Sequence, residues 1–321
     1  MNLEIVKAMM IGSAIGDALG VPVEFMSRKE LALNPVEDMQ GGGTHGQPPG
    51  TWSDDTSMTL CLLESLGRLQ SVDYDDIMNN FVCWMKKGEF TATNTVFDIG
   101  ISTRYALMAY EPDSKLIPRT EPLLCGGAKE QDNGNGSLMR IAPMALYLYR
   151  QNGNNLSWSD MEVVHNVSKL THAHPRSQMA CGIYVLIAAE LLAGNSLGNA
   201  IKAGTCKAYK LYGQRHEFSD EISTYSRLWD IDRFAKLQKH EIKSSGYVVD
   251  TLEAVLWCLL NTTSYPEAVL TAVNLGEDTD TIGAIVGGLA GVTYGYENIP
   301  AYWKETLLKT DLIEGLCEKF V

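Results

Sequence analysis

Positive charge is scarce in this sequence. Its 321 residues include 26 Lys and Arg against 39 Asp and Glu, so the formal net charge is −13 at pH 7. Long-range repulsion of polyanions argues against nucleic acid or an anionic membrane as the main partner. An anionic substrate would therefore need a local source of positive charge, which a bound cation can supply.

Paired cysteine motifs and long uncharged runs are also missing. The 7 cysteines include no Cys-x-x-Cys pair and lie mostly among apolar residues at helical spacing, which is typical of reduced core residues in a cytoplasmic protein. No uncharged run reaches the roughly 18 residues that a membrane span needs. Asp17 and Glu24 interrupt the apolar N-terminus, so we expect a structural helix there and no membrane span.

Sustained alternation of polar and apolar residues is rare, and helical spacing dominates instead. Capping patterns agree with this, for example Ser264 three residues before Glu267. We therefore predict an all-α fold, a single compact multi-helix domain. The expected helices are Ile5–Leu19, Met58–Leu69, Ile77–Met85, Val96–Ala109, Leu138–Tyr149, Met161–Leu170, Met179–Leu192, Leu252–Leu260, Ala268–Leu275 and Ile282–Tyr294.

Three stretches, 34–50, 111–136 and 206–245, break the helical pattern. Each carries Trp, Tyr, Leu or Pro and lies between helices that must share a core, so none is expected to be a flexible linker. We interpret 206–245 as a charged insertion rather than a domain boundary. The whole chain, 1–321, is then one domain.

Glycines recur at one-turn spacing in the first and last long predicted helices. Each interior glycine costs a helix about 1 kcal/mol relative to alanine, so close helix packing is the expected compensation. The two stripes are Gly12, Gly16 and Gly20, and Gly283, Gly287, Gly291 and Gly295.

Pairs of aspartates stand at the starts of two helices. Trp52-Ser-Asp-Asp-Thr56 precedes one helix, and Gly276-Glu-Asp-Thr-Asp-Thr281 precedes the last glycine-rich one. A single aspartate there is most simply an N-cap, but capping uses only one side chain. Four carboxylates brought together would repel one another unless a cation neutralised them. Hard oxygen donors without Cys or His favour Mg²⁺, Mn²⁺ or Ca²⁺ over Zn²⁺.

Taken together, six motifs resemble the ADP-ribosylglycohydrolase family, in family order and over nearly the whole chain. They are Gly16-Asp-Ala-Leu-Gly-Val-Pro-Val-Glu24, Trp52-Ser-Asp-Asp-Thr56, Asn135-Gly-Ser-Leu-Met-Arg140, Thr171-His172, Ser245-Gly-Tyr247 and Gly276-Glu-Asp-Thr-Asp-Thr281 with Gly287-Gly-Leu-Ala-Gly291. The resemblance implies an all-α domain with two Mg²⁺ or Mn²⁺ ions in its cleft. It also implies hydrolysis of the bond between ADP-ribose and an acceptor.

The resemblance also implies roles for individual residues, at the positions where this sequence matches the family motifs. Glu24, Asp55 and Asp278 are expected to be catalytic. The metal ligands implied are Ser53, Asp54, Asp55, Asp278, Asp280 and Thr281, and the substrate-binding residues are Asn135, Gly136, Ser137, His172 and Tyr247.

Two functions remain open at this point. The first is a metal-dependent hydrolase that releases ADP-ribose from an ADP-ribosylated protein or small molecule. Arginine is the leading acceptor, and serine, a base, an ester or a free guanidine are alternatives. The second is a non-catalytic protein of the same fold that binds ADP-ribose or a related nucleotide. Retention of Glu24 favours the enzyme.

Overall fold

A computed structural model describes residues 1–114 and 116–321 and confirms the all-α prediction. Within these residues the only strand-like pairings are 3 isolated bridges. The helices are α1 Leu3–Gly20, α2 Arg28–Leu33, α3 Asp54–Leu69, α4 Tyr74–Lys87, α5 Ile101–Tyr110, α6 Ala142–Asn152, α7 Trp158–Lys169, α8 Pro175–Leu192, α9 Leu197–Tyr212, α10 Ile231–Phe234, α11 Val248–Leu260, α12 Tyr265–Val273, α13 Thr279–Tyr294, α14 Ala301–Thr306 and α15 Thr310–Phe320.

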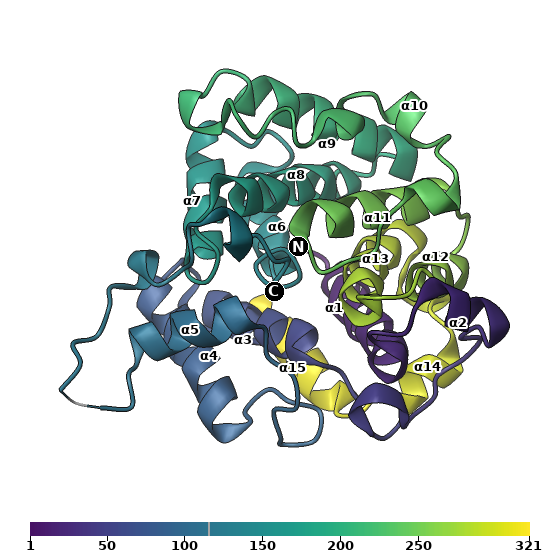
Figure 1. Ribbon diagram of the computed structural model, residues 1–321, viewed down its shortest axis with the longest axis horizontal. Coiled ribbons are helices and arrows are strands. Elements are labelled where there is room, and N and C mark those ends of the chain that lie inside the picture. The colour runs from purple at the N-terminus through teal and green to yellow at the C-terminus, as the bar shows by residue number, and fades with distance from the viewer. Residues whose placement is uncertain (115) are drawn as a thin grey trace.

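Helices α1 and α13 form the central pair, side by side although they lie near opposite ends of the chain (Figure 1). Their glycine stripes face each other, which confirms the expected close helix packing. A Cβ atom placed on Gly16 would lie 2.0 Å from the carbonyl oxygen of Gly283, and one on Gly12 would lie 2.5 Å from that of Gly287. The two backbones touch, so side chains are excluded from this interface.

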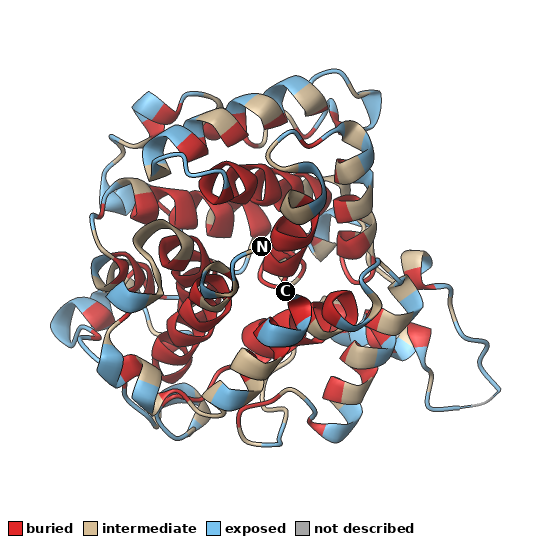
Figure 2. Cartoon of the chain, turned by 180° about the vertical axis from the view of Figure 1, so that it is seen from behind, coloured by how far each residue is buried: buried red, intermediate tan, exposed pale blue. Residues whose placement is uncertain are grey.

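Buried residues are concentrated on the inner helices, and exposed ones lie on the outer helices and loops (Figure 2). The stretch Leu3–Val23 is long and apolar enough to cross a membrane, but 89% of its most apolar window is buried inside the protein. Packing against α13 accounts for that composition. The absence of a membrane span stays a prediction, which this burial supports.

Several helix boundaries differ from the predicted ones, and helices α2, α9, α10, α14 and α15 were not predicted. Helix α5 begins at Ile101 rather than Val96, because Gly100 is its N-cap. Helix α6 begins at Ala142 rather than Leu138, since Pro143 occupies its first turn. Helix α9 runs to Tyr212 and so includes the first residues of the predicted 206–245 insertion. Whether that segment is an insertion stays a prediction.

One buried histidine gives the fold a pH-dependent stability. His165 on α7 is hydrogen-bonded to the Tyr212 hydroxyl at 2.8 Å, and burial lowers its pKa from 6.5 to about 3. Between pH 6.5 and about pH 3, the unfolded chain therefore binds a proton at His165 and the folded protein does not. Stability is then lost as the pH falls from 6.5 towards 3.

We predict that His165→Phe makes the protein less sensitive to acid. From about pH 6 to about pH 4, the free energy of unfolding of the wild type should fall faster than that of the variant, by about 1.4 kcal/mol per pH unit. Urea denaturation at several pH values measures both. The two profiles should run parallel above about pH 7; parallel profiles throughout would refute the assignment.

Candidate active site

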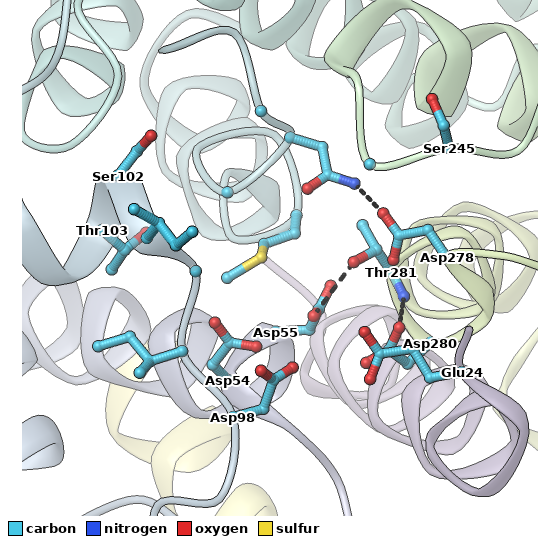
Figure 3. Close-up of a pocket in the computed structure, with 18 of the residues that line it drawn as sticks. Glu24, Asp54, Asp55, Asp98, Ser102, Thr103, Ser245, Asp278, Asp280 and Thr281 are labelled. Carbon is cyan, nitrogen blue, oxygen red and sulfur yellow. Dashed lines mark hydrogen bonds between the residues drawn. The ribbon is translucent and has the colours of Figure 1, made fainter. Parts of the chain in front are cut away.

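A cleft of about 630 Å³ lies where the first turns of α3 and α13 meet. Carboxylates from four separate segments point into it (Figure 3). Its lining includes Glu24, Asp54, Asp55, Asp98, Asn135, Gly136, Met139, His172, Asp278, Asp280 and Thr281.

The start of α3 is held by a buried carboxylate on α1. Asp17 accepts hydrogen bonds from the backbone N–H of Ser53 at 2.9 Å and from the N–H and hydroxyl of Thr56 at 3.0 and 2.6 Å. Ser53 itself caps the helix by accepting from the Asp55 N–H at 3.3 Å. The side chains of Asp54 and Asp55 therefore do not cap the helix; they lie in its first turn and face the cleft.

The start of α13 is fixed from three sides. The Thr279 hydroxyl donates to the Gly20 carbonyl at 2.8 Å, which ties α13 to the end of α1. The Asn135 amide donates to Asp278 Oδ2 at 2.6 Å. The Thr281 hydroxyl donates to Asp55 Oδ2 at 3.3 Å. This last bond joins the two predicted metal-binding motifs directly, so the helix starts meet as the sequence implies.

Glu24 lies beside these motifs because the segment after α1 pairs with the turn before α13. The Phe25 N–H donates to the Glu277 carbonyl, and the Glu277 N–H donates to the Met26 carbonyl, both at 2.7 Å. Phe25 and Glu277 both have left-handed backbones, with φ of 66° and 65°. This conformation costs a non-glycine residue roughly 1–3 kcal/mol, so the surrounding contacts must hold both residues in place. Ligand oxygens of Glu24, Asp278 and Asp280 lie within 4.8 Å of one another.

The electrostatics of this cluster fit a cation. Burial raises the pKa of Glu24 to about 9, with Asp98, Asp278 and Asp54 adding repulsion. Burial and neighbouring carboxylates also raise the pKa values of Asp54, Asp55 and Asp280. Asp55 Oδ1 is buried and has no hydrogen-bond partner within 1–114 and 116–321. A divalent cation would satisfy this oxygen and neutralise the cluster, so these residues fit a metal site.

The predicted substrate residues divide into two groups. Asn135, Gly136 and His172 line the cleft, and the Asn135 amide also positions Asp278. Ser137 is fully buried, and its hydroxyl is hydrogen-bonded to the Ser168 hydroxyl at 2.9 Å. Its side chain therefore belongs to the core behind the cleft wall.

Tyr247 also lies outside the cleft lining, next to Gly246, which is part of it. Its hydroxyl accepts from Arg176 at 2.9 Å, and Arg176 forms an ion pair with Glu221 at 2.6 Å. The Tyr225 hydroxyl donates to the Arg176 carbonyl at 2.7 Å. The 206–245 segment thus holds Tyr247 in place, a contact that the sequence does not reveal.

Several acidic or basic residues at or behind the cleft were not among the predicted site residues. Asp98 lines the cleft, and His45 contacts Glu24 and lies against the ring of Phe97. Both lie in irregular segments, where no periodicity marks a functional side chain. Asp17 does not line the cleft but shapes it through Ser53 and Thr56. Its signal was present in the sequence, as a charge inside an otherwise apolar helix.

Comparison with known families decides the class. The family model described as ADP-ribosylglycohydrolase matches residues 2–321. The protein belongs to the ADP-ribosylglycohydrolase family. The Ser-Asp-Asp-Thr and Asp-Thr-Asp-Thr motifs that meet in the cleft are two of the six on which the sequence resemblance rests.

Two relatives and one solved structure show how far the likeness extends. The ADP-ribosylarginine hydrolase Tri1 of Serratia proteamaculans is 33% identical over 319 residues, covering 99% of this chain and 79% of the relative. The ADP-ribosyl-[dinitrogen reductase] glycohydrolase of Rhodospirillum rubrum is 32% identical over 299 residues, covering 92% and 88%. A structure titled ADP-ribosylglycohydrolase-related protein complex superposes with a TM-score of 0.76 at 28% identity, covering 99% and 97%.

Proposed function

We propose that this ADP-ribosylglycohydrolase family member is a metal-dependent enzyme that hydrolyses the bond between ADP-ribose and arginine. The observation that carries the proposal is the junction of two acidic helix starts, beside Glu24, in a cleft of about 630 Å³. This volume lies within the roughly 300–1,000 Å³ of typical ligand pockets. The names of the two relatives support arginine or a modified protein as the acceptor.

Two Mg²⁺ or Mn²⁺ ions would be held by the predicted ligands at the two helix starts. When bound, such ions would polarise a sugar oxygen and make water a stronger nucleophile near neutral pH. Thr281 and Asn135 orient the ligand oxygens of Asp55 and Asp278. The proposed metal ligands are Ser53, Asp54, Asp55, Asp278, Asp280 and Thr281.

Glu24 is the proposed proton carrier. Its Oε2 contacts His45 Nε2, and no residue in the described part of the chain is bonded to Oε1. Cations bound beside Glu24 would offset the effects of burial and repulsion that raise its pKa, so that the ionised Oε1 could take a proton from the attacking water. The water oxygen bonds to the anomeric carbon as the bond to the guanidinium nitrogen breaks, through an oxocarbenium-like state. The guanidine leaves neutral and takes up the proton released by water.

The proposed substrate is an ADP-ribosylated protein or small molecule in the cytoplasm. All 7 cysteines are free, which is compatible with a reducing compartment. Release of ADP-ribose from a modified protein and from ADP-ribosyl-arginine can be compared directly, with ADP-ribosyl-serine as the competing substrate.

The test of function is hydrolysis of ADP-ribosyl-arginine, followed by chromatography of released ADP-ribose. We expect release with Mg²⁺ or Mn²⁺, loss of release in EDTA, and recovery when either ion is added in excess. Unchanged release in EDTA would refute the metal-dependent mechanism. Tight binding of free ADP-ribose, together with no hydrolysis of any ADP-ribosylated acceptor tried, would favour the non-catalytic alternative.

A further inference from the structure

An arginine is buried without an acidic partner directly behind the cleft. Arg140 is 0% exposed. Its Nη2 donates to the Val167 carbonyl at 3.1 Å and to the Thr171 hydroxyl at 2.8 Å. Its Nε and Nη1 atoms have no hydrogen-bond partner in the described chain, although the guanidinium lies 4.7 Å from the centre of the Phe81 ring. Burying a charge this way is unfavourable, which calls for a reason beyond packing.

The contact with Thr171 has a chemical consequence. A guanidinium only donates hydrogen bonds, so the Thr171 oxygen must be the acceptor. The single hydroxyl proton is then left for another partner, and His172 Nδ1 lies 2.9 Å away. The Thr171 hydroxyl has no other acceptor for this proton in the described chain, so Nδ1 accepts it. If Nδ1 carried the proton and donated instead, the hydroxyl proton of the fully buried Thr171 would be left without a partner. In a neutral imidazole with Nδ1 as acceptor, the ring proton is on Nε2.

The other ring nitrogen is directed to the cleft. His172 Nε2 would lie 3.3 Å from a Cβ atom on Gly136 and 3.6 Å from one on Gly134, two residues of the cleft wall. No described residue is hydrogen-bonded to it. The backbone is fixed as well, since the His172 N–H donates to the Ser168 carbonyl at 2.8 Å and its carbonyl accepts from the Ser168 hydroxyl at 2.9 Å.

We infer that Arg140 and Thr171 are positioning residues that fix His172 as its Nε2–H tautomer, which gives the cleft a neutral hydrogen-bond donor. Only the identity of the ligand, an oxygen of ADP-ribose, rests on the proposed function. The opposite tautomer would present a lone pair to the anionic oxygens of a pyrophosphate and repel them. Burial, with a contribution from Arg140, lowers the pKa of His172 to about 3, so the imidazole is neutral at physiological pH.

The experiment observes the tautomer directly. In the full-length protein labelled with ¹⁵N-histidine, long-range ¹H–¹⁵N spectra distinguish protonated from bare ring nitrogens, and the His172→Gln variant assigns the His172 signals. We expect Nε2 protonated and Nδ1 bare in the wild type. Thr171→Val and Arg140→Met should both populate the Nδ1–H form, whereas Thr171→Ser should restore the wild-type pattern. His165, bonded to Tyr212, provides an internal control whose signals should not change.

Binding of ADP-ribose with Mg²⁺ present, measured by calorimetry, completes the test. Thr171→Val should weaken binding about tenfold or more, since a hydrogen bond to a charged oxygen is at stake, and Thr171→Ser should stay within about twofold of the wild type. A wild-type His172 protonated on Nδ1, or a tautomer unchanged in both Thr171→Val and Arg140→Met, overturns the inference. If the wild type fails to bind ADP-ribose, the proposed function is lost, but the spectra still decide the tautomer.

Discussion

Replacing Asp55 with alanine should reduce kcat/KM for ADP-ribosyl-arginine about a thousandfold, since several kcal/mol of transition-state stabilisation depend on two correctly positioned metal ions. Asp55 bonds to Thr281 across the two helix starts, and its Oδ1 has no partner in the described chain. Metal-free Asp55→Ala should nevertheless be at least as stable as the metal-free wild type. The variant removes a buried carboxylate whose neighbours repel it.

Thermal unfolding with and without Mg²⁺ separates the two effects. At an ion concentration about 100 times Kd, binding should stabilise the wild type by about 2.7 kcal/mol and the variant by much less. Asp220→Asn is the matched control, because it removes one exposed carboxylate that does not line the cleft. Full activity in Asp55→Ala, or an equal response of both proteins to Mg²⁺, would exclude a role for this residue in metal binding.

Gly16→Ala should destabilise the protein by about 3 kcal/mol or more, which is large for the addition of one methyl group. The new Cβ would lie 2.0 Å from the Gly283 carbonyl oxygen and 2.4 Å from its carbon. Both atoms belong to the α13 backbone, so no side chain can rotate away and the two helices must separate. Guanidinium denaturation measures the loss.

Gly315→Ala on α15 is the matched control for this change. It is the same substitution inside a helix, but nothing lies within 4 Å of the added Cβ. The variant should be more stable than the wild type by about 1 kcal/mol, because alanine is the better helix former. Equal changes in the free energy of unfolding for Gly16→Ala and Gly315→Ala would mean that the glycines are not required for the close approach of α1 and α13.

Much of this architecture could be predicted because regular helices carry periodic signals. One-turn spacing of glycines indicated that two helices touch, and the structure confirms contact at Gly16 and Gly283. Paired aspartates at two helix starts exceeded what capping requires, and Asp55 and Thr281 do meet. In each case the signal lay in a short stretch of sequence. A contact with a distant segment was expected because interior glycines and clustered carboxylates are unfavourable in free energy unless something compensates for them.

The rest depends on irregular backbone, which has no such signal. Asp98 precedes Gly100, the N-cap of α5, in a segment whose apolar residues had suggested a longer helix. His45 reaches Glu24 only because the chain turns back at Gly42 and Gly46, where φ is positive. The contact of Tyr247 with Arg176 depends on Glu221 from the 206–245 segment. Such contacts are set by tertiary packing alone.

The pairing of α1 with α13 also governs when the catalytic centre can exist during biosynthesis. Gly20 and Asp280 are in contact, so the first helix emerges from the ribosome long before its partner has been translated. At about 5–20 residues per second, the nascent chain must wait roughly 10–50 s with an uncovered apolar surface. A truncated product ending before α13 would have neither the acidic junction nor a cover for α1, and would be a natural substrate for chaperones and proteases.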